Sequence, residues 1–216
     1  MTKRTKATMA GRLELAQAYE RRLNIHTLAV DPGLSQVDFH YHRNEPTDYQ
    51  VLERLTSELS LSPSDHLVDV GCGRGRALFF IQATYHCQVT GIEGDPDLFK
   101  SLKANQESYL ERFPEAVDQV HLVEGLAEEY LIQPVQSHFY FFNPFTVHVF
   151  KRFIYQVQQS IYQTPRFVTL ILYYPHPAWE QFLQEHTEFR LYQRIPLTNY
   201  SLSAREAIAL YQQNPA

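Results

Sequence analysis

Six of the eight glycines in the chain lie between residues 71 and 125, and a carboxylate stands close to the first of them. Residues 68–76 read V-D-V-G-C-G-R-G-R, with Asp69 two positions before Gly71. Glycine allows the backbone to approach a ligand closely and to adopt a positive φ. Glycines this concentrated, in a chain that otherwise has few, predict that the ligand-binding site lies in this region.

Two phosphate-binding motifs can be compared with this loop. A P-loop needs Gly-Lys-Ser/Thr after four intervening residues, and the chain does not have it. A dinucleotide-binding loop has the spacing G-x-G-x-x-G, which would place its third glycine at Arg76. The third glycine is instead Gly75, so the spacing is G-x-G-x-G. This spacing allows close backbone approach to a ligand without the helix packing of the dinucleotide motif.

A second carboxylate stands at the expected end of the next strand. Glu93 lies 22 residues after Gly71, where a carboxylate can reach both hydroxyl groups of a ribose. The alternative is Asp95, which precedes Pro96 and has the features of a helix N-cap. We therefore predict ribose binding for Glu93 and a structural role for Asp95.

Short apolar segments alternate with helical patterns from residue 66 onward. Strands are expected over 66–70, 87–92, 120–124, 137–142, 167–173, 189–195 and 207–211, and helices over 76–83, 96–108, 147–162 and 179–186. Such alternation predicts right-handed crossovers and a parallel sheet covered on both faces. Only a loop joins the last two strands, so they are expected to be antiparallel. The predicted fold class is α/β: a three-layer sandwich with a seven-stranded, mostly parallel sheet and an antiparallel C-terminal hairpin.

The first 60 residues are expected to form a helical cap on a main domain over residues 61–216. Helices are predicted over about 9–25 and 49–59. Residues 3–22 hold six Lys/Arg against two Asp/Glu, a local charge of +4 that leaves −9 for the remainder. The first helix therefore either packs on the main domain or recruits an acidic partner.

Composition excludes several classes of protein. Hydrophobic residues make up 44% and charged residues 20%, which excludes wholesale disorder. The net charge of −5 does not indicate a general polyanion-binding surface. Two cysteines, Cys72 and Cys87, cannot form a disulfide framework, so a cytoplasmic location is expected. Since no stretch approaches the ~18 apolar residues of a membrane helix, no membrane association is expected.

The segment D-V-G-C-G-R-G over residues 69–75 resembles the first motif of class I S-adenosylmethionine-dependent methyltransferases, and the resemblance covers residues 60–175. It implies S-adenosyl-L-methionine as the cofactor. The implied binding residues are Asp69, Gly71, Cys72, Gly73, Gly75, Glu93, Gly94, Leu126 and Ala127, with Asn143 on the acceptor side and with Tyr41 and Thr47 at the methionine end. After the third strand the family commonly reads Gly-Asp-Ala, whereas this chain has Leu126 at the acidic position. Adenine is then expected to bind through backbone groups and apolar packing, unless Leu126 belongs to the core.

The sequence Asn143-Pro144-Phe145 resembles the Asn-Pro-Pro-Tyr/Phe motif of methyltransferases that act on adenine or amide nitrogen, although the second proline is absent. A residue before proline is pushed toward extended backbone, which would aim Asn143 away from the strand end. The resemblance implies these three residues as the catalytic group. The amide oxygen of Asn143 would accept from an amino group, with Phe145 as a flat wall. Alternatively, Asn143 caps the helix that begins near Val147.

Together these features predict a methyltransferase that acts on a nitrogen of a small molecule or of a protein side chain. A catalytically silent cofactor-binding module and a nucleic-acid methyltransferase are the alternatives, and the charge of −9 over residues 23–216 opposes the latter. His40 and His42 have the spacing of a strand-borne metal pair but lack a third ligand nearby, so no metal is expected. The methyl acceptor is not identified by the sequence.

Overall fold

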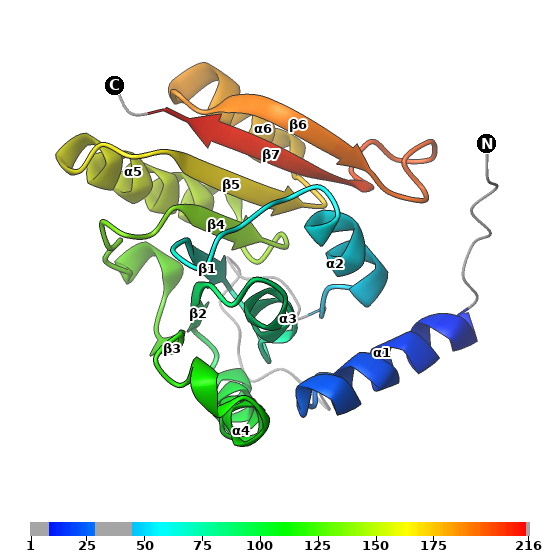
Figure 1. Cartoon of the computed structure of the whole chain (residues 1–216). Helices are drawn as coiled ribbons and strands as arrows, with labels where there is room; N and C mark the ends of the chain where they lie inside the picture. Colours follow the sequence, from blue (N-terminus) through cyan, green and yellow to red (C-terminus); the bar gives the residue numbers. More distant parts are fainter. Residues whose placement is uncertain (1–8, 29–44, 215–216) are drawn as a thin grey trace.

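The computed structural model of the chain describes residues 9–28 and 45–214 (Figure 1). The helices are α1 (Met9–Leu23), α2 (Tyr49–Thr56), α3 (Arg76–Tyr85), α4 (Pro96–Arg112), α5 (Val147–Gln163) and α6 (Pro177–His186), with 3-10 helices η1 (Pro114–Ala116) and η2 (Ala127–Glu129). The strands are β1 (His66–Val70), β2 (Gln88–Glu93), β3 (Val120–Glu124), β4 (His138–Phe141), β5 (Val168–Tyr173), β6 (Arg190–Pro196) and β7 (Ala207–Gln213).

The seven strands form one sheet in the order β3-β2-β1-β4-β5-β7-β6. Strands β1 to β5 are parallel, and β7 pairs antiparallel with both β5 and β6. The predicted fold class is confirmed. Along the chain, the strands from β1 to β3 are added toward one edge of the sheet, and β4 and β5 are added toward the other edge. The direction in which strands are added therefore reverses between β1 and β4. Ligands of open α/β sheets bind outside the carboxyl ends of the strands at such a point.

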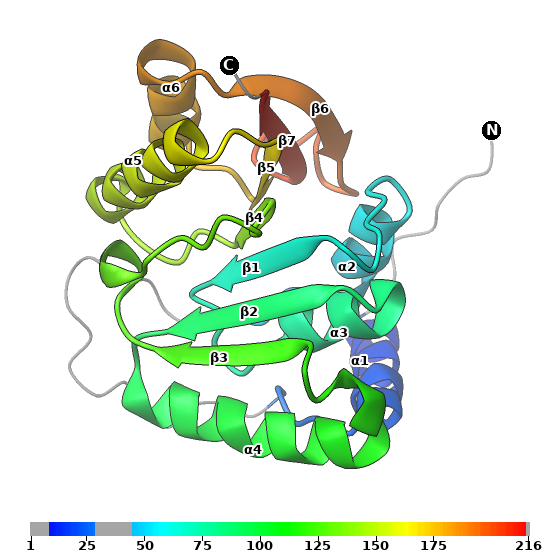
Figure 2. The same ribbon diagram turned by 60° about the vertical axis from the view of Figure 1, so that its left-hand side comes forward.

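Helices cover both faces of the sheet (Figure 2). One hydrophobic cluster packs the four helices α1, α2, α3 and α4 against one face of the sheet. A second cluster packs α5 and α6 against the opposite face. Because both faces are covered, all five residues of β1 are buried, which explains why this strand reads as a nearly continuous apolar run. Leu23 of α1 and Leu52 of α2 belong to the same cluster as Phe80 of α3. The division at residue 60 stays a prediction, since the helical cap and the sheet share this core.

The start of α4 is as the sequence predicts, and its end is not. Asp95 is the N-cap, and its Oδ1 accepts from the backbone N–H groups of Asp97 (2.9 Å) and Leu98 (3.1 Å). The helix continues to Arg112, beyond the expected end at 108. Its last turns carry Tyr109, which is fully buried against Phe79 with ring centroids 4.9 Å apart. Tertiary packing therefore extends the helix beyond its local sequence signal.

No helix in the described part of the chain combines the length and the apolar character needed to cross a bilayer.

A buried histidine at the start of β1 gives a prediction about acid stability. His66 is 8% exposed, its Nε2 lies 2.7 Å from the Thr90 hydroxyl, and burial lowers its pKa to about 4. The unfolded chain, with a His pKa near 6.5, then binds more protons than the folded chain between about pH 4 and 6.5. The stability that His66 contributes is present above pH 6.5 and is lost as the pH falls toward 4.

We expect His66→Gln to make the free energy of unfolding less dependent on pH across this interval. Urea titrations at several pH values measure it. His186→Gln, at an exposed histidine, is the matched control and should keep the wild-type slope. An unchanged slope in His66→Gln would show that this histidine titrates as an exposed one does.

Candidate functional site

The glycine loop between β1 and α3 has the backbone conformations that its sequence suggested. Gly71, Gly73 and Gly75 have φ values of 73°, 56° and 85°, in the left-handed region that side chains other than glycine rarely adopt. At Gly71 there is also no space for a side chain, because an added Cβ would lie 2.5 Å from the Cβ of Pro144. The loop therefore lies directly against the segment that follows β4.

Backbone hydrogen bonds fasten this loop to the end of β2. The N–H groups of Gly71 and Cys72 both donate to the carbonyl of Ile92, at 2.9 and 3.0 Å. The thiol of Cys72 packs toward Gly91, where an added Cβ would meet its Sγ at 2.9 Å, and burial raises the pKa of this thiol well above its usual value. Cys72 thus packs within the loop and is not an activated nucleophile, and its predicted contact with the cofactor stays a prediction.

Glu93, the last residue of β2, lies beside the loop. It is 8% exposed, its Oε2 accepts from the N–H of Gly73 at 2.8 Å, and its Oε1 accepts from the N–H of Asp95 at 2.9 Å. Burial raises the pKa of Glu93, and the N–H groups that it binds oppose this effect. The N–H of Gly94 is a third donor to this carboxylate, which has about four lone-pair positions, so one acceptor position remains for a ligand hydroxyl.

Asp69 lies in β1 beneath the loop. It is 3% exposed, and burial together with the nearby charge of Glu93 raises its pKa to about 8. Its carboxylate accepts from the backbone N–H of Leu78 in the first turn of α3. Gly75, the N-cap of α3, has no side chain to do this. Asp69 therefore satisfies an otherwise free N–H of the helix that the loop opens, where the helix dipole favours negative charge.

The tip of β3 lies next to Glu93. The N–H of Gly125 donates to the Glu93 carbonyl at 3.0 Å, and an added Cβ on Gly94 would lie 3.3 Å from Leu126 Cδ2. Leu126 is 39% exposed, so the alternative that places it in the core is wrong. Ala127 is 3% exposed and packs in the core beneath. An exposed apolar side chain thus stands beside Gly94, where adenine binding was expected.

Asn143 differs from its expected conformation and from its alternative role. Its φ is 44°, in the left-handed region, and it is not extended as the following proline suggested. Asparagine tolerates this region better than most residues, and the contact of Pro144 with Gly71 holds the turn. The N-cap of α5 is Thr146, so the alternative that Asn143 caps this helix is wrong. Its Oδ1 is buried and has no hydrogen-bond partner in the described part of the chain.

Phe145 does not form the expected wall of an acceptor site. Its side chain is fully buried, with ring centroids 5.7 Å from Trp179 and 6.2 Å from Phe141, because the left-handed turn at Asn143 directs the chain back into the core. Instead, Phe142 and Tyr173, directly after β4 and at the end of β5, lie with their rings 4.2 Å apart. This pair was not predicted, although each ring stands where an apolar segment of the sequence ends.

Thr47 connects the N-terminal part of the chain to the sheet. Its hydroxyl lies 2.8 Å from the Tyr140 hydroxyl, and it is 4% exposed. Tyr140 of β4 stands in register with Asp69 of β1. A cofactor contact by Thr47 stays a prediction, and Tyr41, like His40 and His42, lies outside the described residues. Over residues 9–28 and 45–214, no three His, Cys, Asp or Glu side chains are grouped as metal ligands would be.

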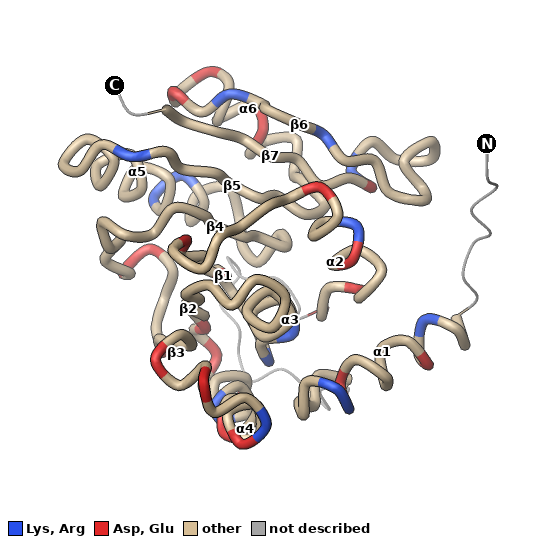
Figure 3. Tube along the Cα trace, in the orientation of Figure 1, with Lys and Arg blue, Asp and Glu red and all other residues tan. Residues whose placement is uncertain are grey.

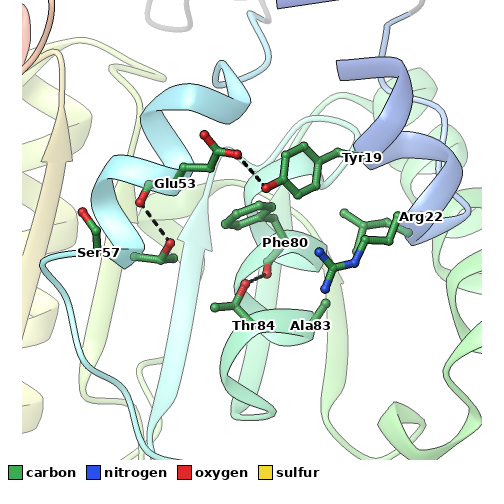
Figure 4. A pocket seen from close by; sticks show the side chains of 9 residues that line it. Tyr19, Arg22, Glu53, Ser57, Phe80, Ala83 and Thr84 are labelled. Carbon is green, nitrogen blue, oxygen red and sulfur yellow. Dashed lines mark hydrogen bonds between the residues drawn. The ribbon is translucent and has the colours of Figure 1, made fainter. Parts of the chain in front are cut away.

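A separate hollow of about 430 Å³ lies between α1, α2 and the second half of α3 (Figure 4). The Tyr19 hydroxyl donates to Glu53 Oε1 at 2.7 Å across it. The glycine loop precedes the other end of α3, so the hollow is not part of the site at the strand ends.

Comparisons with models of known protein families and with curated protein sequences gave no match. Solved structures do match. An RNA methyltransferase from Salinibacter ruber, in complex with S-adenosyl-L-homocysteine, is 18% identical with a TM-score of 0.51, over 79% of this chain and 94% of the other. A precorrin-6y C5,15-methyltransferase from Geobacter metallireducens is 13% identical with a TM-score of 0.54, over 81% and 93%.

A geranyl diphosphate C-methyltransferase from Streptomyces coelicolor, in complex with Mg²⁺, geranyl diphosphate and S-adenosyl-L-homocysteine, is 12% identical with a TM-score of 0.52, over 78% of this chain and 79% of the other. These proteins differ in methyl acceptor and share one arrangement of strands and helices. The likeness at this level of identity concerns the fold. The chain has the Rossmann-like fold of class I S-adenosylmethionine-dependent methyltransferases.

Proposed function

We propose that the chain is an S-adenosylmethionine-dependent methyltransferase that transfers the methyl group to a nitrogen of a small molecule or of a protein side chain. The observation that carries the proposal is the position of Glu93. Its buried carboxylate is fixed by the N–H of Gly73, in the glycine loop that follows β1, and β1 borders the point where the strand order reverses. This is where a nucleoside cofactor binds in an open α/β sheet.

The residues present fit this cofactor. Glu93 keeps a charged acceptor position that a ribose hydroxyl can occupy, beside the N–H groups that hold the carboxylate. Leu126 beside Gly94 offers apolar surface to an adenine ring. Asp69 supplies a carboxylate for the ammonium group at the methionine end. The orphan Oδ1 of Asn143 lies next to Pro144, which contacts Gly71, so the acceptor side adjoins the same loop.

When bound, S-adenosyl-L-methionine supplies a methyl group on a positively charged sulfur, which a nucleophile attacks in line. The protein's part in such a displacement is mainly positioning and exclusion of water. Asn143 Oδ1 can accept from an N–H of the acceptor and so aim the lone pair of that nitrogen. The Phe142–Tyr173 pair at the strand ends supplies apolar surface nearby. Pro144 holds Asn143 against the loop.

The two alternatives fit less well. A nucleic-acid acceptor needs clustered Lys and Arg, whereas Figure 3 shows both signs of charge on α1, α2 and α4, and residues 23–216 carry −9. A catalytically silent cofactor-binding module would not need a buried, unpartnered acceptor atom beside the loop, because leaving one costs about 1–3 kcal/mol.

A methyl-transfer assay tests the proposal. The protein is incubated with methyl-labelled S-adenosyl-L-methionine and, separately, with pooled amines, a peptide library and RNA, and carbon–proton NMR identifies the methylated atom. We expect label on nitrogen in the amine or peptide pool. Label on RNA alone, on carbon or on oxygen would contradict the proposed acceptor, and transfer to none of the pools would favour the silent module.

Glu93 and Asp95 give a paired prediction about cofactor affinity. Glu93→Ala removes a charged acceptor for the ribose and should cost about 1.5–3 kcal/mol of binding free energy. Asp95→Ala should cost about 1 kcal/mol of stability through loss of the α4 cap and leave affinity nearly unchanged. Calorimetry with S-adenosyl-L-homocysteine and urea titration measure the two quantities. If Asp95→Ala loses the affinity and Glu93→Ala loses only stability, Asp95 is the residue that binds the ribose.

Asp69 gives a prediction about protons. With a pKa of about 8 in the free protein it is mostly protonated at pH 7, and a bound ammonium group favours its ionised form. Cofactor binding should therefore release a proton, and affinity should rise as the pH increases from 6 to 8. Calorimetry at pH 7 in buffers of different ionisation heat counts released protons. Asp69→Asn is the control and should release fewer protons when the cofactor binds. Equal proton release by both proteins would show that Asp69 is not the group that loses the proton.

Asn143 gives a prediction about turnover. Asn143→Gly removes the amide and keeps a residue that tolerates the φ of 44°, so the backbone should not change. We expect turnover to fall on the order of 10²–10³-fold, with cofactor affinity within a few-fold, because the lost hydrogen bond orients the acceptor. His86→Gly, at an exposed left-handed residue at the far end of α3, is the matched control and should keep full turnover. Normal turnover in Asn143→Gly would remove Asn143 from the site.

A further inference from the structure

A buried ion pair joins the N-terminal helices to the first residue after the glycine loop. Arg76 and Glu20 are 6% and 7% exposed, and Nη2 of Arg76 lies 3.1 Å from Oε1 of Glu20. The Nε of Arg76 donates to the Thr27 hydroxyl at 2.6 Å, and Nη1 donates to the Thr47 carbonyl at 3.2 Å. The guanidinium also lies 4.8 Å from the centre of the Tyr49 ring. One side chain thus binds four separate positions of residues 20–49.

Stability alone does not account for this arrangement. A buried ion pair pays a large desolvation cost, and apolar residues of similar volume often replace one without loss of stability. Position 76 follows Gly75 at the start of α3, and its guanidinium is directed toward Glu20, Thr27 and Thr47. The arrangement does fix a single geometry, since the planar guanidinium donates in directions that only one placement of α1 and Thr27 satisfies.

A second, independent connection reaches the loop itself. The Nδ2 of Asn105, in α4, donates to the carbonyl of Arg74 at 2.9 Å and to the carbonyl of His26 at 3.2 Å. Its Oδ1 accepts from the N–H of His26 at 2.8 Å. Asn105 is 3% exposed. The N-terminal segment is therefore tied to the loop at residues 74 and 76 by two networks that share no side chain.

These ties matter because the loop is glycine-rich. Three left-handed glycines between β1 and α3 give this backbone many alternative conformations, and each costs entropy to fix. One end of the loop is fixed by β1 and by its bonds to Ile92. The other end is fixed by Arg76 and, through Asn105, by Arg74.

We infer that Arg76 and Glu20 are positioning residues of the cofactor site: through them, residues 20–27 and 47–49 hold the glycine loop in the conformation that binds the methyl donor. The inference rests on the proposed cofactor. Neither residue needs to touch it. Loosening the ion pair should make the loop amides more dynamic and weaken cofactor binding even where the protein stays folded.

The test is the variant Glu20→Gln/Arg76→Met in the full chain. Gln keeps an acceptor for the Thr27 hydroxyl and backbone N–H, and no charge is left buried alone. We expect hydrogen exchange of residues 72–76 to accelerate at least ten-fold and the Kd for S-adenosyl-L-homocysteine to rise at least ten-fold. Both are measured under conditions where urea titration shows the variant folded. Arg76→Lys keeps the charge and loses some of the guanidinium hydrogen bonds, so its loop exchange rate and its Kd should lie between those of the wild type and of the double variant.

The matched control is a second Arg–Glu pair that joins two elements away from the loop, Arg194 of β6 with Glu180 of α6. Glu180→Gln/Arg194→Met should leave loop exchange and Kd unchanged. If the Glu20/Arg76 variant folds less well, Arg76→Lys, which keeps both charges, gives the same comparison. Wild-type loop exchange in the folded variants would overturn the inference. Failure of the wild type to bind the ligand would instead overturn the proposed cofactor, and loop exchange still decides whether Arg76 anchors the loop.

Discussion

The site depends on three backbone N–H groups of the glycine loop that bind the end of β2. Gly71 and Cys72 donate to the Ile92 carbonyl, and Gly73 donates to the Glu93 carboxylate. Burying a carboxylate is costly unless it is hydrogen-bonded, and these bonds allow Glu93 to stand almost fully buried with an acceptor position still free. The same loop position brings Gly71 against Pro144, so the end of β4 adjoins the end of β2 across β1. Without these bonds, the loop would not hold the ends of β2 and β4 next to each other.

The N-terminal helices take part in this arrangement although they lie outside the sheet. Glu20 and Arg76 are 56 residues apart in the sequence, and their ion pair is enclosed by Tyr49, whose ring stacks on Tyr19 at 4.6 Å. The first and second helices are therefore fixed to α3 by polar contacts as well as by the shared core. A part of the chain with no recognisable motif thus supports the part whose motif can be read.

Local patterns in the sequence predicted most of the fold. Apolar runs, the Asp95-Pro96 cap and the glycine spacing each act within a few residues, and the strands and helices follow them closely. Contacts between distant residues explain what was missed. Asn143 takes a left-handed backbone because Pro144 packs on Gly71, and Phe145 turns into the core against Trp179. Arg76 was visible as an arginine in place of a third glycine, but its partners cannot be identified from spacing alone. The two 3-10 helices, of three residues each, are too short to leave a periodic pattern.

The measurement that tests the account most directly is calorimetric titration of the wild-type chain with S-adenosyl-L-homocysteine and, separately, with NAD. Both ligands carry a ribose and an adenine, so Glu93 alone does not distinguish them. The glycine spacing distinguishes them, because a dinucleotide-binding loop needs glycine at the position where this chain has Arg76. The account predicts binding of S-adenosyl-L-homocysteine in the micromolar range and no binding of NAD. Binding of NAD as tightly as S-adenosyl-L-homocysteine, or binding of neither, would contradict it.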